Sequence, residues 1–470
     1  MKSSSKHFGA NARQALHDTT LQRVMGKARG GFIEKRRLAV EALPEFAAIQ
    51  RHGIAIKEHT LAHLADYLQQ FEQNVVESGG CVHWADTPAQ ARDIVVQLCR
   101  EKQARTIAKG KSMIGEEINL NEALEAEGFS AIETDLGEYI IQLAGEPPSH
   151  IITPAVHKTK EQIIELFREH HAKLGYHGVV ETVPQIVDEA RQVLREKFLT
   201  ADVGITGANF LIAETGSTMI VTNEGNGDLS ATLPGTHIVL ASIDKVVPTL
   251  EDCSSLLRLL ARSATGQECT TYTTFFNGPK PRLDGGLSEF HVVLLDNGRS
   301  EMLQGPYRQM LRCIKCGTCM YHCPVYSSVG GHTYGWVYPG PMGSVLTPLM
   351  LGLEEAGELP QASTFCGRCA EVCPMGIPLP DLLRQLRAES FQRRLTPAGK
   401  RLGLRLWSRL ALHPRLYRLV NGMVLGVLRL FSYRGRLRRL PLFGGWMASR
   451  DLPAPPSQSF IRQWQQEKKR

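Results

Sequence analysis

The sequence predicts an α/β domain followed by a cysteine-rich helical module, with a helical segment before them and a basic helical arm after them. Three observations predict this order. Apolar runs alternate with amphipathic stretches from about residue 80 to 300, seven of the eleven cysteines lie between residues 313 and 373, and residues 391–450 hold fourteen Arg or Lys without Asp or Glu. A chain of 470 residues exceeds one ordinary core. We therefore divide it at 1–75, 76–300, 301–385 and 386–470.

The first segment, residues 1–75, is predicted to be helical. Its apolar residues recur at helical spacing, and Gly79 and Gly80 then interrupt the pattern. The residues that carry this periodicity are Ile56, Leu61, Leu64, Leu68 and Phe71.

The second segment alternates strands and helices, which predicts an α/β domain with a mostly parallel sheet. Thr87 and Pro88 illustrate the local signals, because threonine caps a helix and proline suits its first position. The expected helices are 88–102, 116–126, 160–174 and 184–198. The expected strands are 81–84, 106–108, 131–134, 150–152, 203–206, 210–213, 219–222, 237–240 and 290–295.

The cysteine-rich module begins with four cysteines and a proline in the pattern C-x₂-C-x₂-C-x₃-C-P, formed by Cys313, Cys316, Cys319, Cys323 and Pro324. This pattern is the bacterial ferredoxin run, in which the fourth cysteine ligates the neighbouring cluster. Three thiolates at this spacing can wrap one iron–sulfur cubane, and a glycine after the second cysteine lets the backbone approach the inorganic core. The motif predicts an α-helical, ferredoxin-like domain with two clusters.

A second motif, Cys366, Cys369, Cys373 and a following proline, supplies the last three ligands of the same pattern. The crossover rule assigns Cys313, Cys316, Cys319 and Cys373 to a first [4Fe–4S] cluster. It assigns Cys323, Cys366 and Cys369 to a second cluster, [4Fe–4S] or [3Fe–4S], whose fourth ligand is unknown. The motifs indicate electron transfer, and no catalytic residue follows from them.

Ser363 stands where the first cysteine of the second motif belongs. Three outcomes are open: Ser363 ligates iron through its oxygen, the second cluster is [3Fe–4S], or another residue or a partner completes it. For Ser363 itself, the role of an ordinary loop residue is favoured over that of an iron ligand.

The seven motif cysteines have one other interpretation. A two-zinc site built from the seven thiolates is disfavoured, because C-x₂-C-x₂-C is unusual spacing for zinc ligands. The remaining four cysteines, Cys81, Cys99, Cys253 and Cys269, are scattered, and we expect them to be buried thiols.

The net charge of +7 is unevenly distributed. Residues 391–470 carry +16, so the preceding 390 residues carry −9. The arm pairs Leu, Trp and Phe with Arg, which suits docking on an acidic partner or on anionic lipid headgroups, and a solvated helical face is the alternative. No nucleic-acid recognition module accompanies it, so no nucleic-acid partner is expected.

The start of the chain lacks the apolar stretch of a secretory signal, and no apolar run is long enough to cross a membrane. We therefore expect a cytoplasmic protein. Its basic arm could attach it peripherally to the inner membrane face.

Seven further segments of the chain are distinctive: TDLGEYIIQL (134–143), PPSH (147–150), GITG (204–207), AETGS (213–217), TNEGN (222–226), DNGRS (296–300) and GGHTYG (330–335). In these segments the sequence resembles the lactate utilization protein B family, iron–sulfur proteins with a lactate-utilization (LUD) domain. The likeness covers roughly residues 10 to 460.

The resemblance implies a LUD domain similar to sugar-phosphate isomerases and CoA-transferases. It also implies an electron-transfer subunit of a system that oxidises L-lactate to pyruvate. The implied partners are an iron–sulfur subunit of the cysteine-rich heterodisulfide-reductase type and a second LUD-domain protein. The alternatives are a lactate-binding oxidoreductase in its own right and an iron–sulfur redox sensor or scaffold. Hydride removal from a hydroxy acid normally uses a flavin or nicotinamide, and no fingerprint for either is present, which disfavours the oxidoreductase.

The loops of the α/β segment offer weaker hypotheses. Residues 214–218 lie between two apolar strands and predict a tight turn, and Asn223, Glu224 and Asn226 follow the next strand. A carboxylate pocket at these loops is one hypothesis, and a structural hairpin is favoured over it. Four histidines could accept a proton from a hydroxy acid: His150, His157, His237 and His291. For each of them, a packed or surface position without a catalytic role is favoured.

Overall fold

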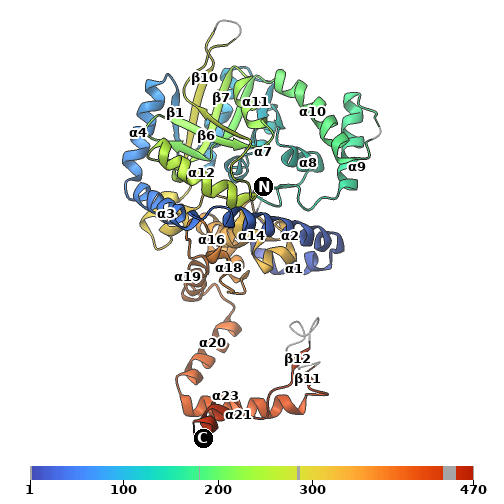
Figure 1. The fold of residues 1–470 in the computed structure, drawn as a ribbon, viewed down its shortest axis with the longest axis vertical. Helices are drawn as coiled ribbons and strands as arrows, with labels where there is room; N and C mark the ends of the chain where they lie inside the picture. The colour runs from blue at the N-terminus through green and yellow to red at the C-terminus, as the bar shows by residue number, and fades with distance from the viewer. Residues whose placement is uncertain (1–2, 179, 283–285, 438–450, 469–470) are drawn as a thin grey trace. The chain divides into compact units, whose positions relative to one another are not determined.

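The computed structural model describes all residues except 1–2, 179, 283–285, 438–450 and 469–470. The chain forms two compact units, Met1–Ser390 and Phe391–Arg470. The first unit contains the α/β domain and the cysteine-rich module, and the second contains the basic arm (Figure 1).

A six-stranded, all-parallel sheet in the order β1-β10-β7-β4-β2-β3 forms the centre of the α/β domain. The predicted α/β fold with a mostly parallel sheet is confirmed. The strands are β1 (Cys81–Ala85), β2 (Thr106–Lys109), β3 (Ser130–Glu133), β4 (Val203–Gly207), β7 (Thr236–Ser242) and β10 (Glu289–Leu295).

Both faces of this sheet are buried, as parallel sheets require. Successive residues of a strand point to opposite faces, so Ile238 and Leu240 of β7 join one core cluster and Val239 and Ala241 join another. The first cluster is completed by α5 (Pro88–Glu101), α6 (Met113–Glu117) and α7 (Leu120–Ala126), and the second by α4 (Leu64–Glu77). The helix expected at 116–126 begins earlier and is divided at Asn119, which has φ +59°.

A second sheet, in the order β8-β5-β6-β9, covers part of the α4 side. Its strands are β5 (Phe210–Ile212), β6 (Ser217–Thr222), β8 (Val246–Val247) and β9 (Tyr272–Phe276). Strands β5 and β6 form an antiparallel hairpin whose turn is the tight turn expected at 214–218. The remaining helices of the domain are α8 (Leu136–Ala144), α9 (Lys160–His171), α10 (Val183–Leu199), α11 (Asn226–Thr232), α12 (Leu250–Ala264) and α13 (Arg299–Gln304).

The strand expected at 150–152 is wrong, because these residues form a loop. His150 Nδ1 accepts hydrogen bonds from the backbone N–H groups of Ile152 and Thr153 at 3.0 and 3.2 Å, which closes the chain locally. The prolines at 147, 148 and 154 have no N–H to give to a ladder. This loop instead packs against the cysteine-rich module, where Ile152 and His150 lie beside Gly317.

The N-terminal helices lie between the α/β domain and the cysteine-rich module (Figure 1). Helices α2 (Thr19–Glu41) and α3 (Phe46–Ala62) pack on α12, and α1 (Phe8–His17) and α2 also pack on α15 (Pro324–Val329). One core cluster runs through all of these elements, from Met25 through Leu256 to Cys319. The boundaries predicted at residues 75, 300 and 385 stay predictions.

The cysteine-rich module consists of short helices around one extended core. Its longer helices, α16 (Gly340–Leu351) and α19 (Leu379–Gln392), bury Val345, Leu383 and Leu386 in that core. The short helices are α14 (Thr318–Tyr321), α15 (Pro324–Val329), α17 (Leu353–Ala356) and α18 (Arg368–Glu371).

A buried ionic network joins the module to the sheet. Arg299 donates hydrogen bonds to both oxygens of Glu117, at 3.0 and 2.8 Å, and to Asp244 at 2.8 Å. Tyr338 of the module donates to the same Glu117 carboxylate. Burial raises the pKa of the Glu117 carboxyl, but the Arg299 guanidinium outweighs burial and the net pKa lies below the ordinary value.

The second unit contains α20 (Ala398–Ala411), α21 (Pro414–Leu430), α23 (Phe460–Glu467) and a two-stranded pair, β11 (Arg436–Leu437) and β12 (Leu452–Pro453). Helix α20 ends at Ala411, and α21 begins with Pro414, which suits the first position of a helix. Large apolar side chains stay exposed on these helices, including Leu406, Trp407 and Leu419. Among the described residues, no helix combines the length and hydropathy needed to cross a membrane.

Replacing Arg299 with Met is expected to lower the free energy of unfolding by about 3 to 5 kcal/mol, because Glu117 and Asp244 would stay buried without their cation. Urea denaturation followed by far-ultraviolet circular dichroism measures the change. The matched control is Arg37→Met, which removes an exposed helix-surface arginine paired with Glu34 and Glu41. Equal effects of the two substitutions contradict a structural role for the buried network.

Candidate iron–sulfur centres

The two cysteine motifs share one backbone conformation. The residues directly before and after Cys316 have positive φ, and so do those before and after Cys366. In both motifs the following residue is a glycine, and a short helix starts after it. The φ angles are +58° at Lys315, +72° at Gly317, +54° at Phe365 and +83° at Gly367. This conformation wraps each loop around its thiols and favours glycine after the cysteine.

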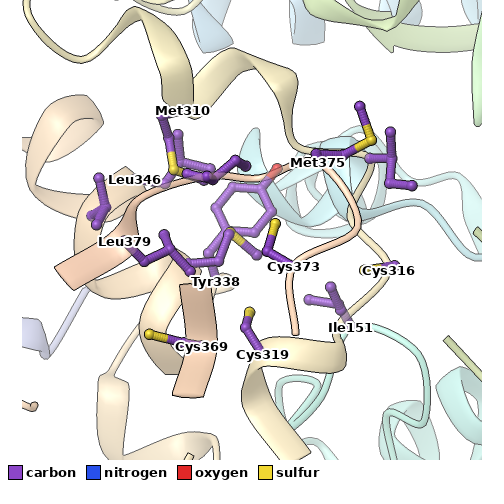
Figure 2. Packing of buried hydrophobic residues seen from close by; sticks show 14 of the residues in the cluster. Ile151, Met310, Cys316, Cys319, Tyr338, Leu346, Cys369, Cys373, Met375 and Leu379 are labelled. Carbon is purple, nitrogen blue, oxygen red and sulfur yellow. The ribbon is translucent and has the colours of Figure 1, made fainter. Parts of the chain in front are cut away.

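The seven cysteines of the motifs line two hollows. The first hollow is lined by Cys313, Cys316, Cys319 and Cys373. The second is lined by Cys323, Cys366, Cys369 and Ser363. In Figure 2 the side chain of Cys369 points away from the group formed by Cys316, Cys319 and Cys373. Each hollow therefore contains thiols from both motifs.

The residues present fit iron–sulfur clusters. All seven thiols are free of disulfides. Burial raises the pKa of Cys369 to about 12, with neighbouring thiols acting in the same direction, and also raises the pKa of Cys316 and Cys319. Closely spaced thiols, of which five are buried here, can lose their protons together only beside a compensating metal cation. The buried Thr318 hydroxyl in the first hollow has no hydrogen-bond partner among the described residues, which leaves it available to a group in that hollow.

Ser363 lies at the position that corresponds to Cys313. The Lys315 N–H donates to Cys313 Sγ at 3.4 Å, and the Phe365 N–H donates to Ser363 Oγ at 3.1 Å. Each side chain therefore accepts a hydrogen bond from the backbone N–H two residues later. In both motifs the donor residue directly precedes a cysteine, Cys316 or Cys366. The serine oxygen holds the place of a ligand sulfur in the wall of the second hollow.

The N-terminal helices and a short 3₁₀ helix, η4 (Arg308–Arg312), hold the second motif from outside. Arg36 of α2 donates to the Val372 carbonyl at 2.9 Å, and Gln50 of α3 donates to the Cys373 carbonyl at 2.8 Å. Arg312 donates to the carbonyl of Gly376 at 3.0 Å. These bonds fix the backbone that brings Cys373 to the first hollow.

The four scattered cysteines lie outside both hollows. Cys99 and Cys253 are buried as expected, and burial raises the pKa of each thiol to about 12. The expectation is wrong for Cys81 and Cys269, which are exposed. Cys81 opens the edge strand β1, where only one neighbouring strand covers it, and Cys269 lies in the loop before β9.

A separate cavity of about 600 Å³ lies where the α/β domain meets the first cysteine motif. Residues at the carboxyl ends of the adjacent strands β2, β4 and β7 line it, which is where open parallel sheets commonly bind ligands. Lys315, between Cys313 and Cys316, lines both this cavity and the first hollow. We call it the interdomain cavity.

Three lysines line the interdomain cavity. Lys111 pairs with Asp135 at 3.2 Å, and the Lys315 ammonium lies 4.2 Å from the centre of the Tyr338 ring. Lys245 is 8% exposed, and burial, with Lys315 acting in the same direction, lowers its pKa to about 8 against the opposing effect of Asp244. No sequence pattern pointed to Lys315 or Tyr338 as cavity residues. Lys245 could have been found, because it is a lysine within a mostly apolar run.

The turn at 214–218 and the loop after the next strand have different roles in the structure. The turn at 214–218 packs on α4, where Gly216 abuts Asn74 and Val75, so it is the structural hairpin that was favoured. Asn223, Glu224 and Asn226 do line the interdomain cavity.

No histidine is among the described residues that line the interdomain cavity. His150 and His237 are buried, and burial lowers the pKa of each to about 3. His157 pairs with Glu146, and His291 with Glu289. Each is therefore a packed or paired histidine, as expected.

The fold and the two cysteine-lined hollows define an iron–sulfur protein that combines a LUD domain with a two-cluster module. Three family models match the chain in order: the LUD domain at residues 68–295, the 4Fe-4S dicluster domain at 309–377, and the C-terminal region of lactate utilisation protein B at 388–470. The chain belongs to the lactate utilization protein B family.

Full-length relatives support this membership. Lactate utilization protein B of Bacillus pumilus is 41% identical and that of Lysinibacillus sphaericus 42% identical, each over 99% of this chain and over 98% and 97% of the relative. A crystal structure of a DUF162 family protein from Deinococcus radiodurans covers 50% of this chain and 97% of its own, with 12% identity. Its TM-score is 0.26, which is too low to carry an argument.

Proposed function

We propose that this protein is the iron–sulfur electron-transfer subunit of a system that oxidises L-lactate to pyruvate. The observation that carries the proposal is the pair of cysteine-lined hollows in one module. The full-length relatives named for lactate utilization support the substrate. Oxidation of lactate to pyruvate releases two electrons and two protons. Two iron–sulfur clusters supply two one-electron acceptors when bound.

The chain's own residues prepare the module for this role. Burial keeps solvent from Cys316, Cys319 and Cys373, and a dry, fixed environment tunes the potential of a cluster held there. The hydrogen bonds that Arg36 of α2 and Gln50 of α3 donate hold the backbone of the second motif in place. Electrons would enter from a substrate-handling partner and leave toward an acceptor.

The proposed partners are a heterodisulfide-reductase-type iron–sulfur subunit and a second LUD-domain subunit. The basic arm supports a docking role, because α20 and α21 expose large apolar side chains together with arginines. An acidic partner surface and anionic headgroups at the inner membrane face both have the complementary charge. We propose a cytoplasmic protein with this arm as its point of attachment.

Reconstitution tests the electron-transfer role. The oxidised protein is mixed anaerobically with the two partner subunits and L-lactate, and the visible absorption of its clusters is followed. Bleaching is expected only in the full mixture. Bleaching by lactate with this protein alone would favour an oxidoreductase in its own right, and no bleaching in the full mixture, with clusters that are merely lost in air, would favour a sensor.

We assign the ligands by crossover. Cys313, Cys316, Cys319 and Cys373 hold the first cluster, and Cys323, Cys366 and Cys369 hold the second. The shared walls of the two hollows support this assignment, since Cys373 of the second motif lines the first hollow and Cys323 of the first motif lines the second.

Single substitutions of the two crossing cysteines test the assignment. Cys373→Ala is expected to abolish the electron paramagnetic resonance signal of the first cluster and to leave the second, because it removes a ligand of the first hollow only. Cys323→Ala should have the reverse effect. Cys81→Ala is the control and should change neither signal. If each substitution instead removes the cluster of its own sequence motif, the crossover is wrong.

We further propose that Ser363 Oγ is the fourth ligand of the second cluster, which is then [4Fe–4S]. Its support is the equivalent hydrogen bond that Ser363 and Cys313 each accept, and its position in the wall of the second hollow. An oxygen donor is harder than a thiolate, so iron at that corner is held less tightly.

Substitution of Ser363 tests this ligand. Ser363→Ala is expected to convert the second cluster to [3Fe–4S], seen as a signal in the oxidised protein and the loss of about one iron per chain. Ser363→Cys should keep four irons and alter the spectrum. Ser327→Ala, which removes a hydroxyl bonded to the Cys323 carbonyl, is the matched control. An unchanged spectrum and iron content in Ser363→Ala exclude the serine as a ligand.

A further inference from the structure

The interdomain cavity has the size and the wall of a small-molecule site. Its volume of about 600 Å³ lies within the range of ligand pockets, and its wall combines apolar residues such as Ile152 and Val221 with many polar and charged ones. It opens at the carboxyl ends of β2, β4 and β7, three neighbouring strands of one parallel sheet. The feature that distinguishes it is its charge.

Two of its lysines lack a carboxylate partner. Lys111 is matched by Asp135. For Lys245, the described part of the chain supplies neither a hydrogen bond nor an ion pair to the ammonium, although the side chain is more than nine-tenths buried. Asp244, its neighbour in sequence, is engaged by Arg299. The contact found for the Lys315 ammonium is with the Tyr338 ring.

The acidic groups in the wall do not offset these lysines. Three lysines in the wall face two carboxyl groups, those of Asp135 and Glu224, and Asp135 is taken by Lys111. A buried ammonium without a partner is costly unless an anion joins it. The cavity therefore carries an excess positive charge that faces its interior.

We propose that the interdomain cavity binds an organic anion whose carboxylate or phosphate lies between Lys245 and Lys315. Because Lys315 belongs to the loop between Cys313 and Cys316, the bound anion touches the wall of the first hollow. Its placement beside the first cluster rests on the proposed function, whereas the anion binding itself does not. The α/β domain thereby presents a small molecule to the electron-transfer module.

Calorimetric titration of the anaerobically purified holoprotein tests the site. The probes are L-lactate, pyruvate and inorganic phosphate. Saturable binding of at least one is expected, at least tenfold weaker in Lys245→Met, and weaker for wild type at high salt. Lys102→Met, which removes a lysine paired with Glu289 outside the cavity, should bind like wild type. Binding of lactate or pyruvate alone identifies a carboxylate site, and binding of phosphate identifies a site for a phosphorylated anion.

Absence of binding by all three probes overturns the inference, and so does equal affinity in wild type and Lys245→Met. If Lys245→Met does not fold, amine acetylation of the wild type replaces it: the bound anion should protect Lys245 and Lys315 in mass spectra and leave Lys102 reactive. Equal labelling of these lysines with and without anion contradicts the site.

The cluster provides an independent readout. A bound negative charge beside the Cys313 loop disfavours the reduced state, so the anion should lower the reduction potential of the first cluster more than that of the second. A preparation that holds no iron but still binds the anion contradicts the proposed function and supports the anion site. A preparation that holds two clusters but binds no anion supports the proposed function and contradicts the anion site.

Discussion

The structure depends on one constraint: residues 313–323 and 366–373 must lie side by side, so that each motif contributes a thiol to the other's hollow. Neither motif encloses a hollow by itself. Arg36 and Gln50 donate to carbonyls of the second motif, and Arg312 donates beside it. The long N-terminal helices are thus part of the cysteine module, although more than three hundred residues separate Arg36 and Gln50 from the carbonyls that they contact.

The same constraint ties the module to the α/β domain. The loop of residues 147–156 packs on Gly317, and Tyr338 reaches the buried pair of Glu117 and Arg299. The interdomain cavity lies beside these contacts and shares Lys315 with the first hollow. A ligand of the sheet and a cluster of the module would therefore share a wall, which is the arrangement that coupling between substrate and electron transfer requires.

The sequence predicted what local patterns determine. Alternating apolar runs gave the strands, and the spacing of Cys313 to Cys373 gave the two groups of thiols that the hollows display. It failed where tertiary contacts decide. Apolar residues 151 and 152 pack on the cysteine loop instead of forming a strand, and Cys81 is exposed because its strand lies at an edge. Lys245 and Lys315 carry no motif, since only folding brings them to one cavity.

Iron and sulfide analysis combined with electron paramagnetic resonance of the anaerobically purified, reduced protein tests the central claim most directly. Two complete cubanes predict about eight iron and about eight acid-labile sulfide per chain, with the signals of two interacting reduced clusters. A colourless protein that holds zinc or no metal, yet keeps its biological activity, would contradict the account.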